Sequence, residues 1–506
     1  MEDGAGRLMD VVIGIDHGTT RTKALALDRE LRIVAEGVAS LDASFPKPGW
    51  VEQDPLAILR VTTDALEQCL ARLPGDARVL GIGLANQGET VVLWDRLTGQ
   101  PVYPAIVWQD RRTSDLCDRL AASGFGDVVR ERAGLRLDPY FSASKVRWVL
   151  DHVPQAQELL RDGRLLVGTT DTWIVWNWSG RRLYLTDATT ASRTALLDIE
   201  HLVWDEVLLA GFGLDGLTLP QIVRSDEVVG LVSPLPGLAV PLVGLAVDQQ
   251  AALLSHACLE PGMAKATYGT GTFILMQVGH VPRRSEHGLL TTVAWLLRSG
   301  PSYAFDGGVY TTGAAVQWLV EGLGLLHDPA ESADLARTVA DNGGVVFVPA
   351  LAGLSAPYWD TRARGLLIGM TRATTRAHVV RAVLEGIAFS VRAIVEAMEQ
   401  DSGVRISVLR VDGGPTANEF LMQFQADILG VPLEVARETE ATARGAALLA
   451  GLGLGLWDLG TIAARWECRR IYEPSMPETV RSALIAQWER AVERCRGWAT
   501  DERFSP

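Results

Sequence analysis

Near the start of the chain, two short apolar runs flank a polar turn. Val11–Ile15 is rich in β-branched residues and Ala24–Leu27 is a second apolar run, so the pattern predicts a β-hairpin. The turn between them carries Asp16, Gly18 and several threonines. Glycine lets the backbone approach a ligand closely, and turn N–H groups and hydroxyls can hold phosphate oxygens. The stretch therefore fits either a plain hairpin loop or a phosphate-binding turn.

A second turn of the same kind lies at residues 265–276, in the other half of the chain. It again combines glycines with threonines and runs into an apolar strand. Two such turns predict a duplicated fold that holds a polyphosphate from both sides.

Other apolar runs end in polar or glycine-rich stretches. Val79–Ala85 reads as a buried strand followed by Asn86–Thr90, and open α/β sheets bind ligands at the carboxyl ends of their strands. Val408–Asp412 reads as another buried strand and is followed by Gly413 and Gly414. Thr416 is expected to cap the next helix. Strands that alternate with helical segments predict an α/β fold.

A stretch rich in proline and glycine, Gly230–Val247, separates the two halves. It holds three prolines and three glycines, so it is unsuited to a membrane helix and predicts short strands that end at Asp248. We place the domain boundary near residue 250, which gives a first domain at 8–250 and a second at 251–506.

Composition and charge narrow the class of protein. The 506 residues carry a net charge of −14, which disfavours nucleic acid or an anionic membrane as the main partner. The five cysteines are scattered and form no C-x-x-C pair, so we expect a reducing cytoplasm without structural zinc. Met1–Asp10 lacks the apolar core of a secretion signal. A cytoplasmic enzyme without membrane insertion is the expectation.

Six motifs resemble those of one family, the FGGY carbohydrate kinases. They are Asp16–Thr20, Trp108–Arg112, Asp138–Ser142, Asp248–Ala252, Tyr268–Gly271 and Asp412–Gly414. Four further stretches are similar to the family's glycerol-phosphorylating subgroup: Phe45–Asp54, Ala188–Thr194, Ala356–Asp360 and Phe420–Gln425. The resemblance implies two actin/hexokinase-like (ribonuclease H-like) α/β domains around an interdomain cleft.

The resemblance also implies a reaction, the ATP-dependent phosphorylation of a small polyol, with glycerol to glycerol 3-phosphate as the named reaction. Asp248 matches the family's catalytic aspartate and would act as general base; the alternative is a helix N-cap, and the two roles are compatible. Asp16 is the Mg²⁺ candidate, through water. The ATP-binding matches are Thr19, Thr20, Arg21, Lys23, Thr270, Gly313, Gln317, Gly414 and Asn418. The polyol-binding matches are Glu89, Trp108, Tyr140, Asp248, Gln249 and Phe273, of which Trp108 and Phe273 could instead be core aromatics.

One position departs from the glycerol-phosphorylating pattern. The residue before the pocket glutamate Glu89 is Gly88, where the subgroup typically has arginine. The loss of a guanidinium would remove a donor to a substrate hydroxyl, open volume and leave Glu89 less compensated. The acceptor could then be another small polyol or ketose with four or five carbons. Alternatively, water or another side chain fills the gap and glycerol remains the acceptor.

Other classes of protein fit less well. A Walker-type P-loop is excluded because the chain contains no Gly-Lys dipeptide. A non-catalytic sugar or nucleotide sensor with this fold would be expected to lose Asp16, Thr19, Thr270 or Asp248, and all four are present. A homodimer or homotetramer is possible within the family.

Overall fold

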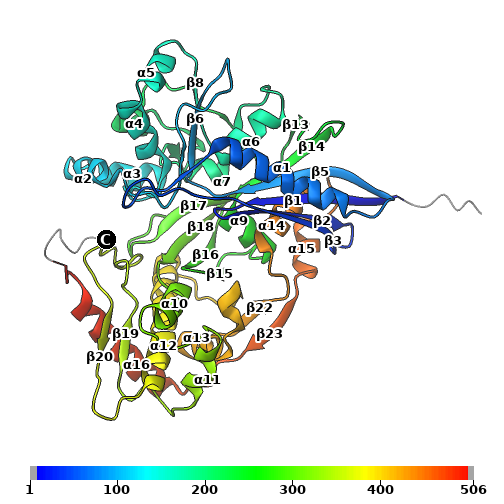
Figure 1. Cartoon of the computed structure of the whole chain (residues 1–506). Helices are drawn as coiled ribbons and strands as arrows, with labels where there is room; N and C mark the ends of the chain where they lie inside the picture. The colour runs from blue at the N-terminus through cyan, green and yellow to red at the C-terminus, as the bar shows by residue number, and fades with distance from the viewer. Residues whose placement is uncertain (1–7, 500–506) are drawn as a thin grey trace, which may run out of the picture.

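Two large mixed β-sheets, one from each half of the chain, form the framework of the protein (Figure 1). The computed structural model describes residues 8–499, so both ends of the sequence, including the last seven residues of the predicted second domain, lie outside the described residues. The first sheet contains β1 Met9–His17, β2 Arg21–Asp28, β3 Ile33–Ser40, β5 Ala77–Asn86, β13 Val228–Val232 and β14 Val240–Val247. The second contains β15 Ala264–Tyr268, β16 Thr272–Gly279, β17 Leu290–Leu297, β18 Gly300–Val309, β21 Leu409–Asp412, β22 Leu433–Ala436 and β23 Cys468–Tyr472.

The two sheets repeat one strand order. In the first, β3, β2 and β1 pair antiparallel, and β5 and then β14 add in parallel. In the second, β18, β16 and β15 pair antiparallel, and β21 and then β22 add in parallel. Both predicted Gly/Thr turns join the first two strands of their sheet. The repetition confirms the duplicated fold predicted from these turns.

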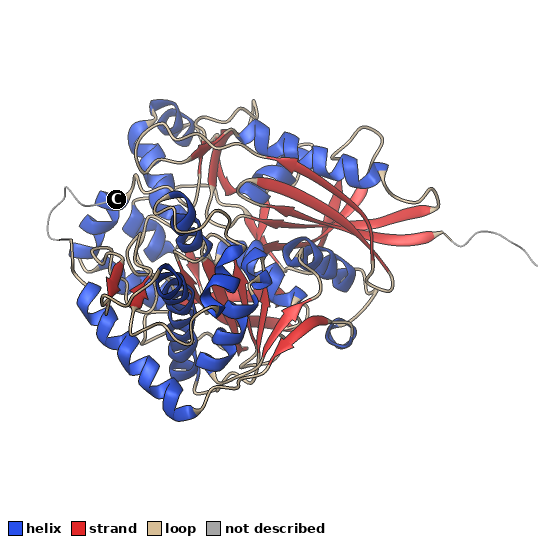
Figure 2. Ribbon diagram, turned by 60° about the horizontal axis from the view of Figure 1, so that its bottom comes forward, coloured by secondary structure: helices blue, strands red, loops and turns tan. Residues whose placement is uncertain are grey.

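Smaller sheets and sixteen α-helices among residues 8–499 complete the fold (Figure 2). The smaller sheets pair β4 Glu52–Gln53, β7 Ala105–Ile106, β6 Val91–Asp95 and β8 Leu165–Thr169; β9 Leu185–Asp187 with β12 Gln221–Val223; β10 Leu197–Asp198 with β11 Val203–Trp204; and β19 Val346–Val348 with β20 Leu366–Ile368. The helices are α1 Pro55–Ala71, α2 Ser114–Ala122, α3 Phe125–Ala133, α4 Ser142–His152, α5 Pro154–Arg161, α6 Thr170–Trp178, α7 Ala188–Ala191, α8 Glu206–Phe212, α9 Asp248–Ser255, α10 Gly313–Glu321, α11 Glu331–Arg337, α12 Arg376–Ser402, α13 Glu419–Leu429, α14 Ala441–Gly453, α15 Leu459–Ala464 and α16 Glu478–Cys495.

Helix α14 comes from the C-terminal half but packs on the sheet of the N-terminal half. It contacts β1, β5 and β14, while α1 covers the opposite face (Figure 1). Glycines permit the close approach: a Cβ at Gly14 would lie 2.0 Å from the Ala443 carbonyl oxygen, and one at Gly83 the same distance from that of Ala446. The alanine-rich composition of α14 therefore serves a close helix–sheet contact that ties the two halves together.

Three parallel strands of the first sheet end side by side. The pairing aligns Asp16 at the end of β1 with Ala85 of β5, and Val247 at the end of β14 with Asn86. Asp248 begins α9 directly after β14, so the carboxyl ends of β1, β5 and β14 bring together polar residues, as in other open α/β sheets. The predicted domain boundary near residue 250 falls inside α9 and stays a prediction. Among the described residues, no helix is long and apolar enough to cross a membrane.

Candidate active site

The first Gly/Thr turn connects β1 to β2 and is closed by a hydrogen bond from the Gly18 N–H to the Arg21 carbonyl over 3.1 Å. Thr20 and the Arg21 side chain are exposed. Lys23 is paired with Glu36 at 3.1 Å and with Glu440 at 3.0 Å. The turn therefore presents hydroxyls and N–H groups, and its lysine already has two carboxylate partners.

Asp16 lies at the end of β1, beneath this turn. Burial, together with the charges of Asp248 and Glu440, raises its pKa to about 8. Carboxylates that destabilise one another's charge in this way fit a divalent cation, which would relieve the repulsion. No group of three His, Cys, Asp or Glu side chains among residues 8–499 could hold a metal by itself. The donor set fits Mg²⁺, which usually keeps several waters and is shared with substrate phosphates.

The second Gly/Thr turn connects β15 to β16 and opens onto a cavity of about 1040 Å³. A hydrogen bond of 2.7 Å from the Gly269 N–H to the Gly271 carbonyl closes this turn. Five predicted ATP-binding residues line the cavity, namely Thr270, Gly313, Gln317, Gly414 and Asn418. Sequence reasoning did not single out other lining residues, among them Thr312, Trp318, Ala330 and Ser332.

Two glycines shape this cavity in different ways. A Cβ at Gly313 would lie 2.6 Å from the Gly269 carbonyl oxygen, so the start of α10 packs directly on the second turn. A Cβ at Gly414 would meet no atom within 4 Å, which leaves its backbone open to a flat ligand. The expected cap at Thr416 is wrong, because Asn418 Oδ1 accepts the Leu421 N–H at 2.9 Å and caps α13 instead. Thr416 lies in the short 3₁₀ helix Gly414–Ala417 and donates to the Gly413 carbonyl.

The predicted polyol-binding residues come from both halves of the chain. Trp108 meets Tyr140 edge to face at 5.6 Å between ring centroids, and Phe273 of β16 at 6.3 Å. Buried Lys145 stabilises the backbone around Tyr140, because its Nζ donates to the carbonyls of residues 139, 140 and 141. These contacts form an aromatic wall where the two halves meet.

Asp248 is the first residue of α9, so Val247, and not Asp248, holds the N-cap position. Its Oδ1 accepts the Gln249 N–H at 2.6 Å. Burial and the charge of Glu89 raise the pKa of Asp248 to about 6, while the Gln249 N–H, Lys265 and Arg193 act in the opposite direction. The Asp248 carboxylate thus lies near the Glu89 carboxylate, the cations of Lys265 and Arg193, and the N-terminus of α9. This setting suits proton transfer.

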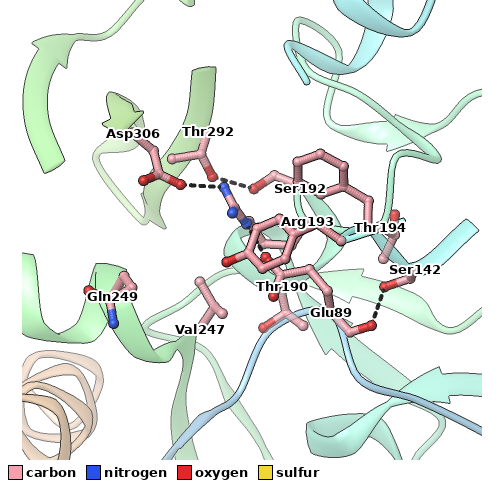
Figure 3. Close-up of polar contacts among 12 residues, drawn as sticks. Glu89, Ser142, Thr190, Ser192, Arg193, Thr194, Val247, Gln249, Thr292 and Asp306 are labelled. Atoms are coloured by element: carbon pink, nitrogen blue, oxygen red, sulfur yellow. Dashed lines mark hydrogen bonds and ion pairs between the residues drawn. The ribbon is translucent and has the colours of Figure 1, made fainter. Parts of the chain in front are cut away.

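The Glu89 carboxylate is paired with a buried arginine. Arg193, from the turn after α7, donates through Nε to Glu89 Oε1 at 2.7 Å and through Nη1 to Asp306 Oδ2 at 2.8 Å (Figure 3). Glu89 therefore has a cationic partner from another segment, which supports the alternative that another side chain takes the place of the missing arginine. A Cβ at Gly88 would lie 2.6 Å from Val247 Cγ2, so the space directly beside this residue is filled, and the expected opening of the pocket further out stays a prediction. Sequence reasoning quoted Arg193 within a motif but gave it no role.

Comparisons with known proteins identify the family of the chain. The sequence model of the N-terminal domain of the FGGY family of carbohydrate kinases matches residues 11–255, and that of the C-terminal domain matches residues 264–454. The chain is a member of the FGGY carbohydrate kinase family. Its actin/hexokinase-like two-domain α/β fold and its enzyme class, an ATP-dependent carbohydrate kinase, follow from this membership.

Proteins named glycerol kinase resemble the chain over nearly its whole length. Glycerol kinase 2 of Thermotoga maritima is 47% identical over 97% of this chain and 99% of its own length. Glycerol kinase of Symbiobacterium thermophilum is 48% identical, with the same coverage. The crystal structure of Plasmodium falciparum glycerol kinase with ADP superposes with a TM-score of 0.91 at 36% identity, over 96% of this chain and 98% of that one.

Proposed function

We propose that this FGGY kinase transfers the γ-phosphoryl group of ATP to glycerol and forms glycerol 3-phosphate. The observation that carries the proposal is the placement of Asp248, Glu89 and Tyr140 within electrostatic reach of one another where the two halves meet. The relatives named glycerol kinase, at 47% and 48% identity, support glycerol as the acceptor.

Each polyol-binding residue has a distinct chemical task in this proposal. Asp248 accepts the proton of the attacking hydroxyl, and a pKa of about 6 leaves it deprotonated at neutral pH. Glu89, Tyr140 and Gln249 bind the acceptor's hydroxyls, whereas the rings of Trp108 and Phe273 cover its carbon chain. Since phosphoryl transfer depends mainly on positioning and charge stabilisation, this arrangement of acceptors and donors can perform it.

The nucleotide binds between the two Gly/Thr turns in the proposal. Thr19, Thr20, Arg21 and Lys23 hold phosphates from the first turn, Thr270 holds them from the second, and Gly313, Gln317, Gly414 and Asn418 form the nucleoside side. Asp16 would hold Mg²⁺ through water, and the bound ion would neutralise charge on the transferring phosphates. Residues 8–250 would thus supply the polyol side, and residues 251–506 most of the nucleotide side.

A coupled assay of ADP release with Mg-ATP tests the acceptor. The panel is glycerol, dihydroxyacetone, erythritol, erythrulose, xylulose, ribulose and gluconate, and Asp248→Asn is the inactive control. We expect glycerol to give the highest kcat/KM, because Val247 and Arg193 fill the space directly beside Gly88. A higher value for a four- or five-carbon acceptor would refute glycerol but not the kinase. Turnover of none of the acceptors, with ATP still bound, would favour the sensor alternative.

A further inference from the structure

The space beside Gly88 is occupied by two neighbouring side chains. A Cβ at this position would lie 2.6 Å from Val247 Cγ2, 3.5 Å from Arg193 Cγ and 3.7 Å from Arg193 Cβ. The stem of Arg193 therefore runs directly past the position at which the subgroup typically carries an arginine. Although the chain lacks a guanidinium attached at position 88, it has one beside Glu89.

This guanidinium belongs to a buried ion network, which we call the Arg193 bridge and define as Glu89, Arg193 and Asp306. The side chains of Glu89 and Arg193 are each 4% exposed and that of Asp306 is 9% exposed. Two buried carboxylates share one cation, so the bridge carries a net negative charge. Buried carboxylate oxygens that are not bonded to Arg193 need other hydrogen-bond donors, and the hydroxyls of a polyol can be these donors.

The two ion pairs of the bridge leave one donor and one acceptor without a partner. Arg193 uses Nε for Glu89 Oε1 and Nη1 for Asp306 Oδ2. In the part of the chain that the structure describes, Arg193 Nη2 and Glu89 Oε2 have no hydrogen-bond partner. Because Nε–H and Nη2–H share one edge of the rigid guanidinium, the free Nη2 faces the same carboxylate. A donor and an acceptor side by side match a hydroxyl group, which both accepts and donates.

We propose that Arg193 is the arginine of the polyol site, with Nη2 donating to one acceptor hydroxyl that in turn donates to Glu89 Oε2. This inference rests on the proposed function, since it assigns a further binding residue to the same pocket. Arg193 is then a specificity-determining residue, although it does not stand at position 88, where the subgroup typically has its arginine.

The turn that carries Arg193 is fastened to the C-terminal half. Asp306 lies on β18, and the neighbouring Ser192 hydroxyl is hydrogen-bonded to the Thr292 hydroxyl of β17 at 2.9 Å (Figure 3). Gln250 of α9 donates to the same Thr292 hydroxyl at 2.9 Å. These bonds fix the guanidinium in place before any acceptor binds, so the binding of an acceptor does not have to order it.

Arg193→Lys is the decisive variant, because lysine keeps the positive charge but lacks the planar guanidinium whose separate N–H groups bond to Glu89 and Asp306. We expect the KM of the acceptor to rise roughly tenfold to a hundredfold, with the KM of ATP close to that of the wild type. Arg112→Lys is the matched control: Arg112 is also buried and bridges two carboxylates, those of Glu52 and Asp110, outside the polyol site. Loss of thermal stability with an unchanged acceptor KM in both variants would overturn the proposal.

Substrate analogues separate direct contact from an effect on the fold. Propane-1,2-diol and propane-1,3-diol each lack one hydroxyl of glycerol. The penalty of Arg193→Lys should shrink for the diol that lacks the hydroxyl bound by Arg193, and equal penalties for all three acceptors would refute the direct contact. If Arg193→Lys fails to fold, Asp306→Ala provides the test, since it keeps the bond to Glu89 but removes the oxygen that accepts the Arg193 Nη1 hydrogen bond, and it should raise acceptor KM less steeply. An unchanged acceptor KM in a folded Asp306→Ala would then refute the proposal.

The proposed function and the role of Arg193 can fail independently. Should the wild type prefer an acceptor other than glycerol, the same kinetic comparison is made with that acceptor and with its deoxy analogues. A selective rise in its KM would support the role of Arg193 although glycerol is wrong. A wild type that prefers glycerol, together with an Arg193→Lys variant of normal glycerol KM, would refute the role of Arg193 alone.

Discussion

Trp108 connects the polyol side of the active site to the first phosphate turn through a single hydrogen bond. Its indole Nε1 donates to Thr19 Oγ1 over 2.9 Å, while the ring faces Tyr140 and Phe273. An indole nitrogen can only donate, so the Thr19 oxygen accepts and its own O–H stays free for a phosphate oxygen. We therefore predict that Trp108→Phe, a change in the polyol pocket, weakens the use of ATP.

The expected size of this effect follows from the bond that is lost. A neutral hydrogen bond contributes about 0.5–1.5 kcal/mol net, which corresponds to about a twofold to tenfold fall in kcat/KM for ATP at saturating glycerol. Phenylalanine keeps an aromatic ring at the same place, so the KM of glycerol should change less. Phe273→Leu is the matched control, because Phe273 packs on the same indole at 6.3 Å but has no donor. It should alter glycerol KM and leave ATP kinetics unchanged.

A double-mutant cycle with Thr19→Val identifies the bond itself. Either single variant removes the same hydrogen bond, so the double variant should cost little more than Thr19→Val alone. Additive losses in kcat/KM for ATP, measured on variants with wild-type thermal stability, would show that Trp108 does not act through Thr19. An unchanged kcat/KM for ATP in Trp108→Phe would refute the connection altogether.

Three further predictions concern single residues. Because the pKa of Asp248 is about 6, kcat/KM should fall about tenfold from pH 7 to pH 5, whereas a base with the pKa of an ordinary aspartate would leave kcat/KM almost unchanged. Asp248→Asn should abolish this pH dependence and lower kcat at least about a hundredfold. A flat pH profile of the wild type would contradict the assignment of Asp248 as the base. Lys145→Met should reduce the free energy of unfolding by roughly 1–3 kcal/mol in urea, because three carbonyls lose their charged donor, and an unchanged midpoint would contradict this. Gly88→Arg should lower thermal stability without improving glycerol KM, because its Cβ meets Val247; improved KM would show that the gap matters.

The strands and turns were predictable because their signals are local. The hairpin predicted from Val11–Ile15 and Ala24–Leu27 is formed by β1 and β2, and the buried strand predicted at Val79–Ala85 is β5. Alternation, β-branched residues and glycine turns act over a few positions, so the sequence alone carries them. The helix cap was predicted wrongly at Thr416 instead of Asn418, because a 3₁₀ turn, which has no strong sequence signal, precedes α13.

The charge partners in the site could not be predicted, because they are distant in sequence. Arg193 lies 104 positions from Glu89 and 113 from Asp306, and its bond to Asp306 forms only when both halves of the chain are folded. The hydrogen bond between Trp108 and Thr19 also joins residues that are distant in sequence, 89 positions apart. A motif gives the type of residue at a position, whereas the partner of a buried charge depends on three-dimensional packing.

Gly88 shows that the absence of a motif residue does not mean that its chemical group is absent from the site. Burial of a carboxylate without a cation costs several kcal/mol, so a fold that buries both Glu89 and Asp306 requires a cation near them, from whichever segment can supply it. Here α7 and its following turn supply Arg193, which bonds to both carboxylates. If Arg193 has the role proposed for it, acceptor specificity depends on which hydroxyl of the acceptor meets the free edge of Arg193 and the second oxygen of Glu89, and not on the residue at position 88.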